Sequence, residues 1–298
     1  MRLKKFFQKA VDQLRFVPAS APGVDLVAAE RKITDDWFRS HYGYAADIVA
    51  DWLGKEIDLS ASCIVDFGCG DGIMDLGLAL KHQPKAVVGV DIHDAHKYLE
   101  KTAQDQLGIA LLPSNLRFVT VAAGDSLRSI GPIDALFSWS VFEHVERHLL
   151  PAIFADAFNA LAKGGVFFLQ IEPLYYSPFG SHLSGLLSEP WAHLLLSNEE
   201  LLEEIDQKQP EQMSDEHKNK TFELCTFNDF KEYLKREYRS LNRITSTELI
   251  KIVEGAGFVV DKKRLNTTDL MPPARLRDAH SEHDLRCTEL MLLLRRPG

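Results

Sequence analysis

The chain has 298 residues, of which 45% are hydrophobic and 26% charged. This is the composition of a folded protein with a sizeable core, and it excludes wholesale disorder. The formal charge of −9, from 34 Lys and Arg against 43 Asp and Glu, disfavours a surface that tracks nucleic-acid phosphates. Four scattered cysteines without a CxxC pair predict neither a disulfide framework nor a zinc site, and a reducing cytoplasm is expected.

The N-terminal region, residues 1–44, is expected to form accessory helices. Residues 1–15 alternate apolar and basic side chains at helical spacing, which predicts a short amphipathic helix that either packs on the core or lies on a membrane surface. It lacks the cleavage site of a signal peptide, and no apolar run approaches the roughly 18 residues of a membrane span. A linker at 18–23 and a helix over 34–54 follow.

From residue 63 the chain alternates short apolar runs with helical patterns. The predicted strands are 63–67, 86–91, 116–121, 133–138 and 166–171, and the predicted helices are 72–82, 94–106 and 151–162. Such alternation is typical of parallel βαβ units, so we expect an α/β fold whose open sheet is covered by helices on both faces.

The alternation breaks after residue 172. Residues 172–240 begin aromatic and rich in Pro and Gly, then become acidic between 199 and 216, which indicates an insertion. A helix over 244–254, capped by Thr245 or Ser246, follows it. Two final strands, 257–262 and 288–294, are predicted to form a hairpin-like antiparallel edge.

The strongest local signal is the segment Ile64-Val-Asp-Phe-Gly-Cys-Gly-Asp-Gly72, in which a strand runs into three glycines at alternate positions. Glycines allow a backbone to turn tightly and approach a ligand, and the amides of a following helix suit an anionic or nucleotide-like ligand. The dinucleotide pattern GxGxxG is not met, because Ile73 or Asp75 stands at its third glycine. A nicotinamide oxidoreductase is therefore disfavoured.

This segment resembles the acidic-x-G-x-G-x-G motif of the class I S-adenosylmethionine-dependent methyltransferases. Other features resemble that family in the same order: a strand-ending acid at Asp91, the segment 133–145 with Ser-x-x-Glu-His-Val, the turn 161–165 with Lys163 in place of a proline, and Ala-Gly-Phe258 before a late strand. The resemblance implies a Rossmann-like seven-stranded, mostly parallel sheet with an antiparallel last strand. It also implies S-adenosylmethionine as cofactor and S-adenosylhomocysteine as product.

The resemblance also implies which residues bind the methyl donor. They are Asp66, Gly68, Cys69, Gly70, Gly72, Asp91, Ile92, Asp125, Ser126, Ser138 and Trp139. In the family, the acid at the position of Asp91 binds the ribose hydroxyls, as a strand-ending carboxylate does in dinucleotide folds. Simpler structural interpretations remain open: Asp66 fixes the glycine turn, Asp91 caps the end of its strand, and Asp125 stabilises a turn through its side chain.

The activated methyl group needs in-line alignment more than covalent catalysis, whereas a hydroxyl acceptor also needs its proton removed. The candidate catalytic residues are His144, His182 and His193. The alternative is a structural histidine for His144 and a surface histidine for His182 and His193. Some relatives bind a divalent metal through E-x-x-E-H. Because Ser140 replaces the first Glu before Glu143 and His144, no metal is expected.

The methyltransferase core is predicted at 45–172 and 244–298, and the insertion at 173–243 is predicted to form the acceptor pocket. Its aromatic and imidazole side chains suit a small acceptor, and they are Tyr175, Tyr176, Phe179, His182, Trp191 and His193. We expect O-methylation of a small hydroxylated metabolite, saccharide or lipid-linked sugar, with no nucleic-acid partner. N-methylation of a small amine, or a non-catalytic donor-binding protein of the same fold, are the alternatives.

Overall fold

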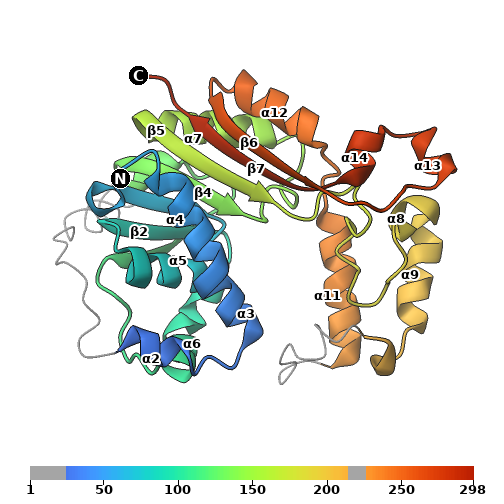
Figure 1. Ribbon diagram of the computed structural model, residues 1–298, viewed down its shortest axis with the longest axis horizontal. Coiled ribbons are helices and arrows are strands. Elements are labelled where there is room, and N and C mark those ends of the chain that lie inside the picture. The colour runs from blue at the N-terminus through green and yellow to red at the C-terminus, as the bar shows by residue number, and fades with distance from the viewer. Residues whose placement is uncertain (1–24, 214–225) are drawn as a thin grey trace.

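A computed structural model describes residues 25–213 and 226–298 (Figure 1). The predicted amphipathic helix at 1–15 and the linker at 18–23 lie outside the described residues. Within the described part of the chain, no helix is long and apolar enough to cross a membrane.

A seven-stranded sheet forms the centre of the molecule. Its strands are β1 (Cys63–Phe67), β2 (Ala86–Asp91), β3 (Leu116–Thr120), β4 (Ile133–Trp139), β5 (Leu161–Ile171), β6 (Val259–Thr267) and β7 (Cys287–Arg295). They lie in the order β3-β2-β1-β4-β5-β7-β6. The first five pair in parallel, and β7 runs antiparallel to both β5 and β6. The predicted Rossmann-like sheet with an antiparallel last strand is confirmed.

Helices cover both faces of this sheet (Figure 1). The described helices of the core are α2 (Leu26–Glu30), α3 (Asp36–Phe38), α4 (Ala46–Gly54), α5 (Ile73–Gly77), α6 (Leu99–Leu107), α7 (Leu150–Ala160) and α12 (Ser246–Gly255), and a π-helical stretch, Arg39–Ala45, joins α3 to α4. Adjacent strand residues point to opposite faces, as Ile64 and Val65 do. Ile64 belongs to the apolar cluster under α4, α5 and α6, whereas Val65 belongs to the cluster under α7 and α12. This two-sided burial explains the continuous apolar strands.

Several boundaries differ from the sequence-based prediction. Strand β5 begins at Leu161 instead of 166, because Leu161 pairs with Ile133, and residues 162–165 form an irregularity before Val166 pairs with Ala135. The glycines that were predicted to stop a helix lie inside this extended strand, where Gly164 adopts a φ of 77°. Of the two candidate caps, Thr245 caps α12, in a capping box with Glu248.

The segment between β5 and α12 packs around an apolar cluster of its own. It contains α8 (Ala192–Leu195), α9 (Asn198–Gln207) and α11 (Phe227–Ser240), which lie together beyond the end of β5 (Figure 1). Buried residues of this cluster include Leu183, Leu201 and Phe230. The connection from β6 to β7 carries two short helices, α13 (Ala274–Arg277) and α14 (Glu282–Arg286), and packs against α8 through Trp191.

Candidate functional site

A cavity of about 780 Å³ opens where the chain after β1 and the chain after β4 meet. Strands β2 and β3 follow β1 outward to one side of the sheet, and β5 follows β4 to the other, so this is the point at which the strand order reverses. Open α/β sheets bind ligands in the crevice at such a point. Residues after β1, β4 and β5 line the cavity, together with the π-helical stretch near the N-terminus and helix α11.

The three glycines after β1 all have positive φ, at 88°, 53° and 75°, but for different reasons. A Cβ at Gly68 would lie 2.4 Å from a methyl of Val141, and one at Gly72 would lie 2.5 Å from the ring of Phe118. A Cβ at Gly70 would meet nothing within 4 Å. The outer two glycines are therefore required by packing, whereas Gly70 leaves space open beside the loop, where a ligand can approach the backbone.

Asp91, at the carboxyl end of β2, is tied to this loop. Its Oδ2 accepts a hydrogen bond from the amide of Gly70 at 2.9 Å, and its Oδ1 accepts one from the amide of His93 at 2.8 Å. The carboxylate thus caps the strand end, as one interpretation predicted. It is half-buried and has lone pairs to spare for a ligand hydroxyl, since a carboxylate can accept about four hydrogen bonds.

The remaining predicted donor residues on this side lie at the exposed strand ends. The side chain of Ile92 is 56% exposed. Asp125 accepts a hydrogen bond from the amide of Ala122, as a side chain that stabilises a turn does, and the Ser126 hydroxyl donates a hydrogen bond to Asp156. None of these side chains lines the cavity among the described residues.

Asp66 points away from the cavity and into the core. It is 1% exposed and lies near Asp75 of α5, which is fully buried, and neither carboxylate accepts a conventional hydrogen bond from another group in the described chain. Burial, reinforced for Asp66 by the charge of Asp75, raises the pKa of both carboxyl groups well above their usual range. Asp66 is therefore buried next to the glycine loop and does not line the cavity.

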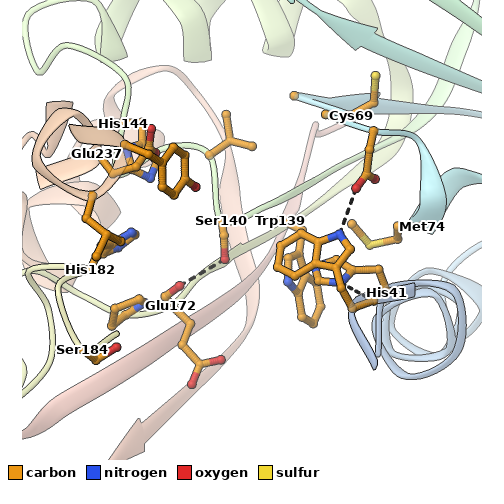
Figure 2. A pocket seen from close by; sticks show the side chains of 18 of the residues that line it. His41, Cys69, Met74, Trp139, Ser140, His144, Glu172, His182, Ser184 and Glu237 are labelled. Carbon is orange, nitrogen blue, oxygen red and sulfur yellow. Dashed lines mark hydrogen bonds and ion pairs between the residues drawn. The ribbon is translucent and has the colours of Figure 1, made fainter. Parts of the chain in front are cut away.

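The end of β4 contributes Trp139 and Ser140 to the cavity wall, with Cys69 of the glycine loop also lining it (Figure 2). Ser138 does not line it, since its hydroxyl is buried and donates to the carbonyl of Phe67. Ser140 has a φ of 51°, and its hydroxyl bonds the side chain of Gln170 and the carbonyl of Glu172. A left-handed non-glycine residue at a cavity wall is typical of a functional site.

The N-terminal region, which was expected to contribute to the acceptor pocket, supplies the wall of the cavity beside the glycine loop. Trp37 donates from Nε1 to Asp71 at 2.8 Å, directly beside the glycine loop. The ring of His41 lies 3.7 Å from that of Trp37, and both line the cavity with Met74 (Figure 2).

The opposite end of the cavity holds two imidazoles, those of His144 and His182 (Figure 2). Their ring centroids are 5.0 Å apart in an edge-to-face arrangement. Burial lowers the pKa of His144, and burial together with the neighbouring His144 lowers the pKa of His182 to about 4. Both rings are therefore neutral near pH 7, with a nitrogen lone pair available. Glu143, 4% exposed, comes just before His144, and burial raises its pKa to about 8.

His193, the third candidate base, is not brought to this cavity. It is 5% exposed, its Nε2 bonds the carbonyl of Tyr175 at 2.6 Å, and burial lowers its pKa to about 4. Tyr175 and Trp191 of the predicted aromatic cluster are buried as well. His193 is thus neither at the surface nor in the cavity, and His182 is the member of the cluster that lines the cavity.

Helix α11 provides the aromatic lining instead. Phe230, Tyr233, Leu234 and Glu237 face the cavity from successive turns. Their spacing of i, i+3, i+4 and i+7 is the signal that could have identified them, although the same stripe is equally typical of a core-facing helix.

The chain is similar to known methyltransferases. A ribosomal protein L11 methyltransferase of Shewanella denitrificans is 30% identical over 149 residues, which are 46% of this chain and 48% of that protein. The chain thus spans about half the length of the curated relative it matches.

Among solved structures, one of a geranyl diphosphate methyltransferase in complex with GPP and sinefungin is 14% identical, with a TM-score of 0.48 over 85% of this chain and 78% of that one. The magnesium protoporphyrin IX methyltransferase of Synechocystis PCC 6803 with bound SAH is 16% identical, with a TM-score of 0.47 over 98% and 96% of the two chains.

A family model described as a methyltransferase domain matches residues 37–263. This range includes the glycine loop, the end of β4 and all of α11, so it takes in the residues that line the cavity. Because it spans well over half of the sequence, the chain belongs to the methyltransferase-domain family.

Proposed function

We propose that this protein transfers the methyl group of S-adenosylmethionine to a hydroxyl of a small metabolite, saccharide or lipid-linked sugar, and releases S-adenosylhomocysteine. The observation that carries the proposal is one continuous cavity with a glycine loop at one end and two neutral imidazoles at the other. The donor fits the first end, and a protic acceptor fits the second.

The fit of the donor rests on the loop itself. Space is open beside Gly70, and Asp91 stands at the neighbouring strand end with hydrogen-bonding capacity left. Gly68, Cys69 and Gly70, which line the cavity, would hold the donor together with Asp91, whose carboxylate is bonded to Gly70 but does not itself line the cavity. Trp37, Met74 and Trp139 would enclose the donor. A bound donor supplies a methyl group already activated on a sulfonium.

The chain's own task is then alignment, exclusion of water and activation of the acceptor. The acceptor hydroxyl loses its proton, its oxygen forms the new bond to the methyl carbon, and the electrons of the C–S bond remain on sulfur. His144 and His182 carry the nitrogen lone pairs at this end of the cavity, so activation of the hydroxyl falls to them. The aromatic face of Tyr233 suits stacking on an apolar or sugar ring.

The test is transfer of a labelled methyl group from S-adenosylmethionine to matched pairs of acceptors that differ only in carrying a hydroxyl or an amine. We expect label in the hydroxyl member. Label in the amine member alone contradicts O-methylation. Saturable binding of S-adenosylhomocysteine, with no transfer to any fraction of a cell extract, would indicate a non-catalytic donor-binding protein.

A further inference from the structure

Three side chains of the metal-binding types converge beside the acceptor end of the cavity, which two of them, His144 and His182, line. One ligand atom from each of Glu143, His144 and His182 lies within 4.8 Å of the others. Glu143 and His144 belong to the turn after β4, whereas His182 comes from the segment that follows β5. Tertiary structure therefore assembles the cluster from separate parts of the chain.

The carboxyl group of Glu143 lacks the hydrogen-bond partners that a buried polar group needs. The side chain is 4% exposed, and neither oxygen makes a hydrogen bond to another residue in the described chain. Buried carboxylates are normally paired with a cation or bound to a metal. A cation held beside Glu143 would meet this need.

The two imidazoles are also arranged as ligands. Nε2 of His182 is buried and has no hydrogen-bond partner among the described residues. Nδ1 of His144 lies 2.7 Å from the hydroxyl of Ser240, which donates its own hydrogen to the carbonyl of Glu237. Since that hydroxyl must accept from Nδ1, the His144 ring carries its proton on Nδ1 and its lone pair on Nε2. Metal-binding histidines are commonly oriented through their second nitrogen in this way.

We propose that Glu143, His144 and His182 bind a divalent first-row transition cation. Two imidazoles with one carboxylate favour Zn²⁺, Mn²⁺ or Fe²⁺ over Mg²⁺ and Ca²⁺, which prefer sites built from oxygen. This departs from the sequence-based expectation of no metal, which rested on Ser140 in place of a glutamate. The missing ligand is supplied by His182, which no local motif could reveal.

The consequence for catalysis rests on the proposed function. A cation at this position polarises the acceptor hydroxyl, so that its proton can leave to water near neutral pH. The imidazoles then act through the cation instead of taking the proton directly.

The experiment titrates Co²⁺, as a spectroscopic stand-in, into full-length protein that has been dialysed against a chelator, with Zn²⁺ as competitor. We expect one equivalent to bind with visible d–d absorption that Zn²⁺ abolishes. Glu143→Gln and His182→Asn each remove a ligand and should weaken binding by more than about 100-fold, while Ser240→Ala, which removes an orienting partner, should weaken it about tenfold.

His148→Asn is the matched control, because His148 lies four residues from His144 with its side chain 72% exposed, and it should leave affinity unchanged. Near-ultraviolet circular dichroism checks that each variant is folded. Because Ser240 is exposed, the Ser240→Ala variant keeps the test valid if a variant of a buried residue does not fold. Absence of stoichiometric binding, or affinity unchanged in both ligand variants, overturns the site. Full methyl transfer after chelation overturns the catalytic role and leaves the proposed function standing. Stoichiometric Co²⁺ binding with no hydroxyl methylated supports the site and contradicts the function.

Discussion

The imidazole of His144 is hydrogen-bonded to the hydroxyl of Ser240, at 2.7 Å and across 96 positions of sequence. His144 follows β4, and Ser240 is the last residue of α11. The bond therefore joins the turn after the central strand β4 to the helix that lines the acceptor end of the cavity. It determines which nitrogen of His144 is free.

Ser240→Ala should lower the turnover number about tenfold while leaving the affinity for S-adenosylhomocysteine unchanged, because the ring loses its orienting partner but the glycine loop is untouched. Initial rates and calorimetric titration measure the two quantities. Ser129→Ala, which removes another exposed hydroxyl bonded to a backbone carbonyl, is the control. A loss of donor affinity in Ser240→Ala would indicate a general structural role instead.

Two of the loop glycines, Gly70 and Gly72, should respond differently to substitution by alanine. Gly72→Ala places a methyl 2.5 Å from Phe118 in a left-handed backbone, so the free energy of unfolding should fall by more than about 2 kcal/mol. Gly70→Ala meets no clash and should cost only about 1 kcal/mol for its positive φ. Its methyl nevertheless projects beside the donor, so S-adenosylhomocysteine binding should weaken.

Urea unfolding and calorimetric titration of both glycine variants give the comparison. Gly70→Ala with unchanged donor affinity would mean that the ligand does not approach the loop at this point.

Trp37→Phe should weaken donor binding by up to about tenfold. The substitution keeps an aromatic ring beside His41 but removes the hydrogen bond from Nε1 to Asp71. Because the pair is exposed, its effect on overall stability should stay below about 1 kcal/mol. Titration with S-adenosylhomocysteine checks the first expectation and thermal unfolding the second. Wild-type affinity in the variant would show that this wall does not depend on the bond.

Stability should decrease with acidification because of His193. Burial lowers the pKa of this ring from 6.5 to about 4, so the unfolded chain binds the proton first as the pH falls. The contribution of His193 to the free energy of unfolding is therefore complete above about pH 6.5 and declines toward pH 4, by up to about 3 kcal/mol.

His193→Gln lacks the titrating group, so denaturant unfolding between pH 7 and 4 should show a shallower decline in the variant than in the wild type. Parallel declines would mean that another group causes the acid sensitivity.

Local sequence predicted the strands most closely. Cys63–Phe67 and Ala86–Asp91 have the predicted bounds, because a buried parallel strand needs a continuous apolar run and glycine or polar residues mark its ends. Strand β5 began earlier than predicted, since Lys163 and the glycines after it have the composition of a turn. Only the pairing of Leu161 with Ile133, on the far side of these residues, shows that the strand begins before them.

The acceptor end was the least predictable part. His182 and His193 lie 11 positions apart in segments of similar composition, yet one faces the cavity and the other bonds a buried carbonyl. In the sequence, Phe230 and Tyr233 belong to the apolar side of an ordinary amphipathic helix, and the spacing of its apolar residues does not indicate whether that side faces a core or a cavity.

The sequence by itself determined the doubly wound sheet, the glycine loop and the acid at Asp91, because each depends on backbone conformations and burial patterns set within a few neighbouring residues. Tertiary structure alone decided that Trp37 closes one end of the cavity, that α11 lines the other, and that Glu143, His144 and His182 meet there. These relationships join segments far apart in the chain. They exist only once the apolar faces of those segments have packed, which no local pattern specifies.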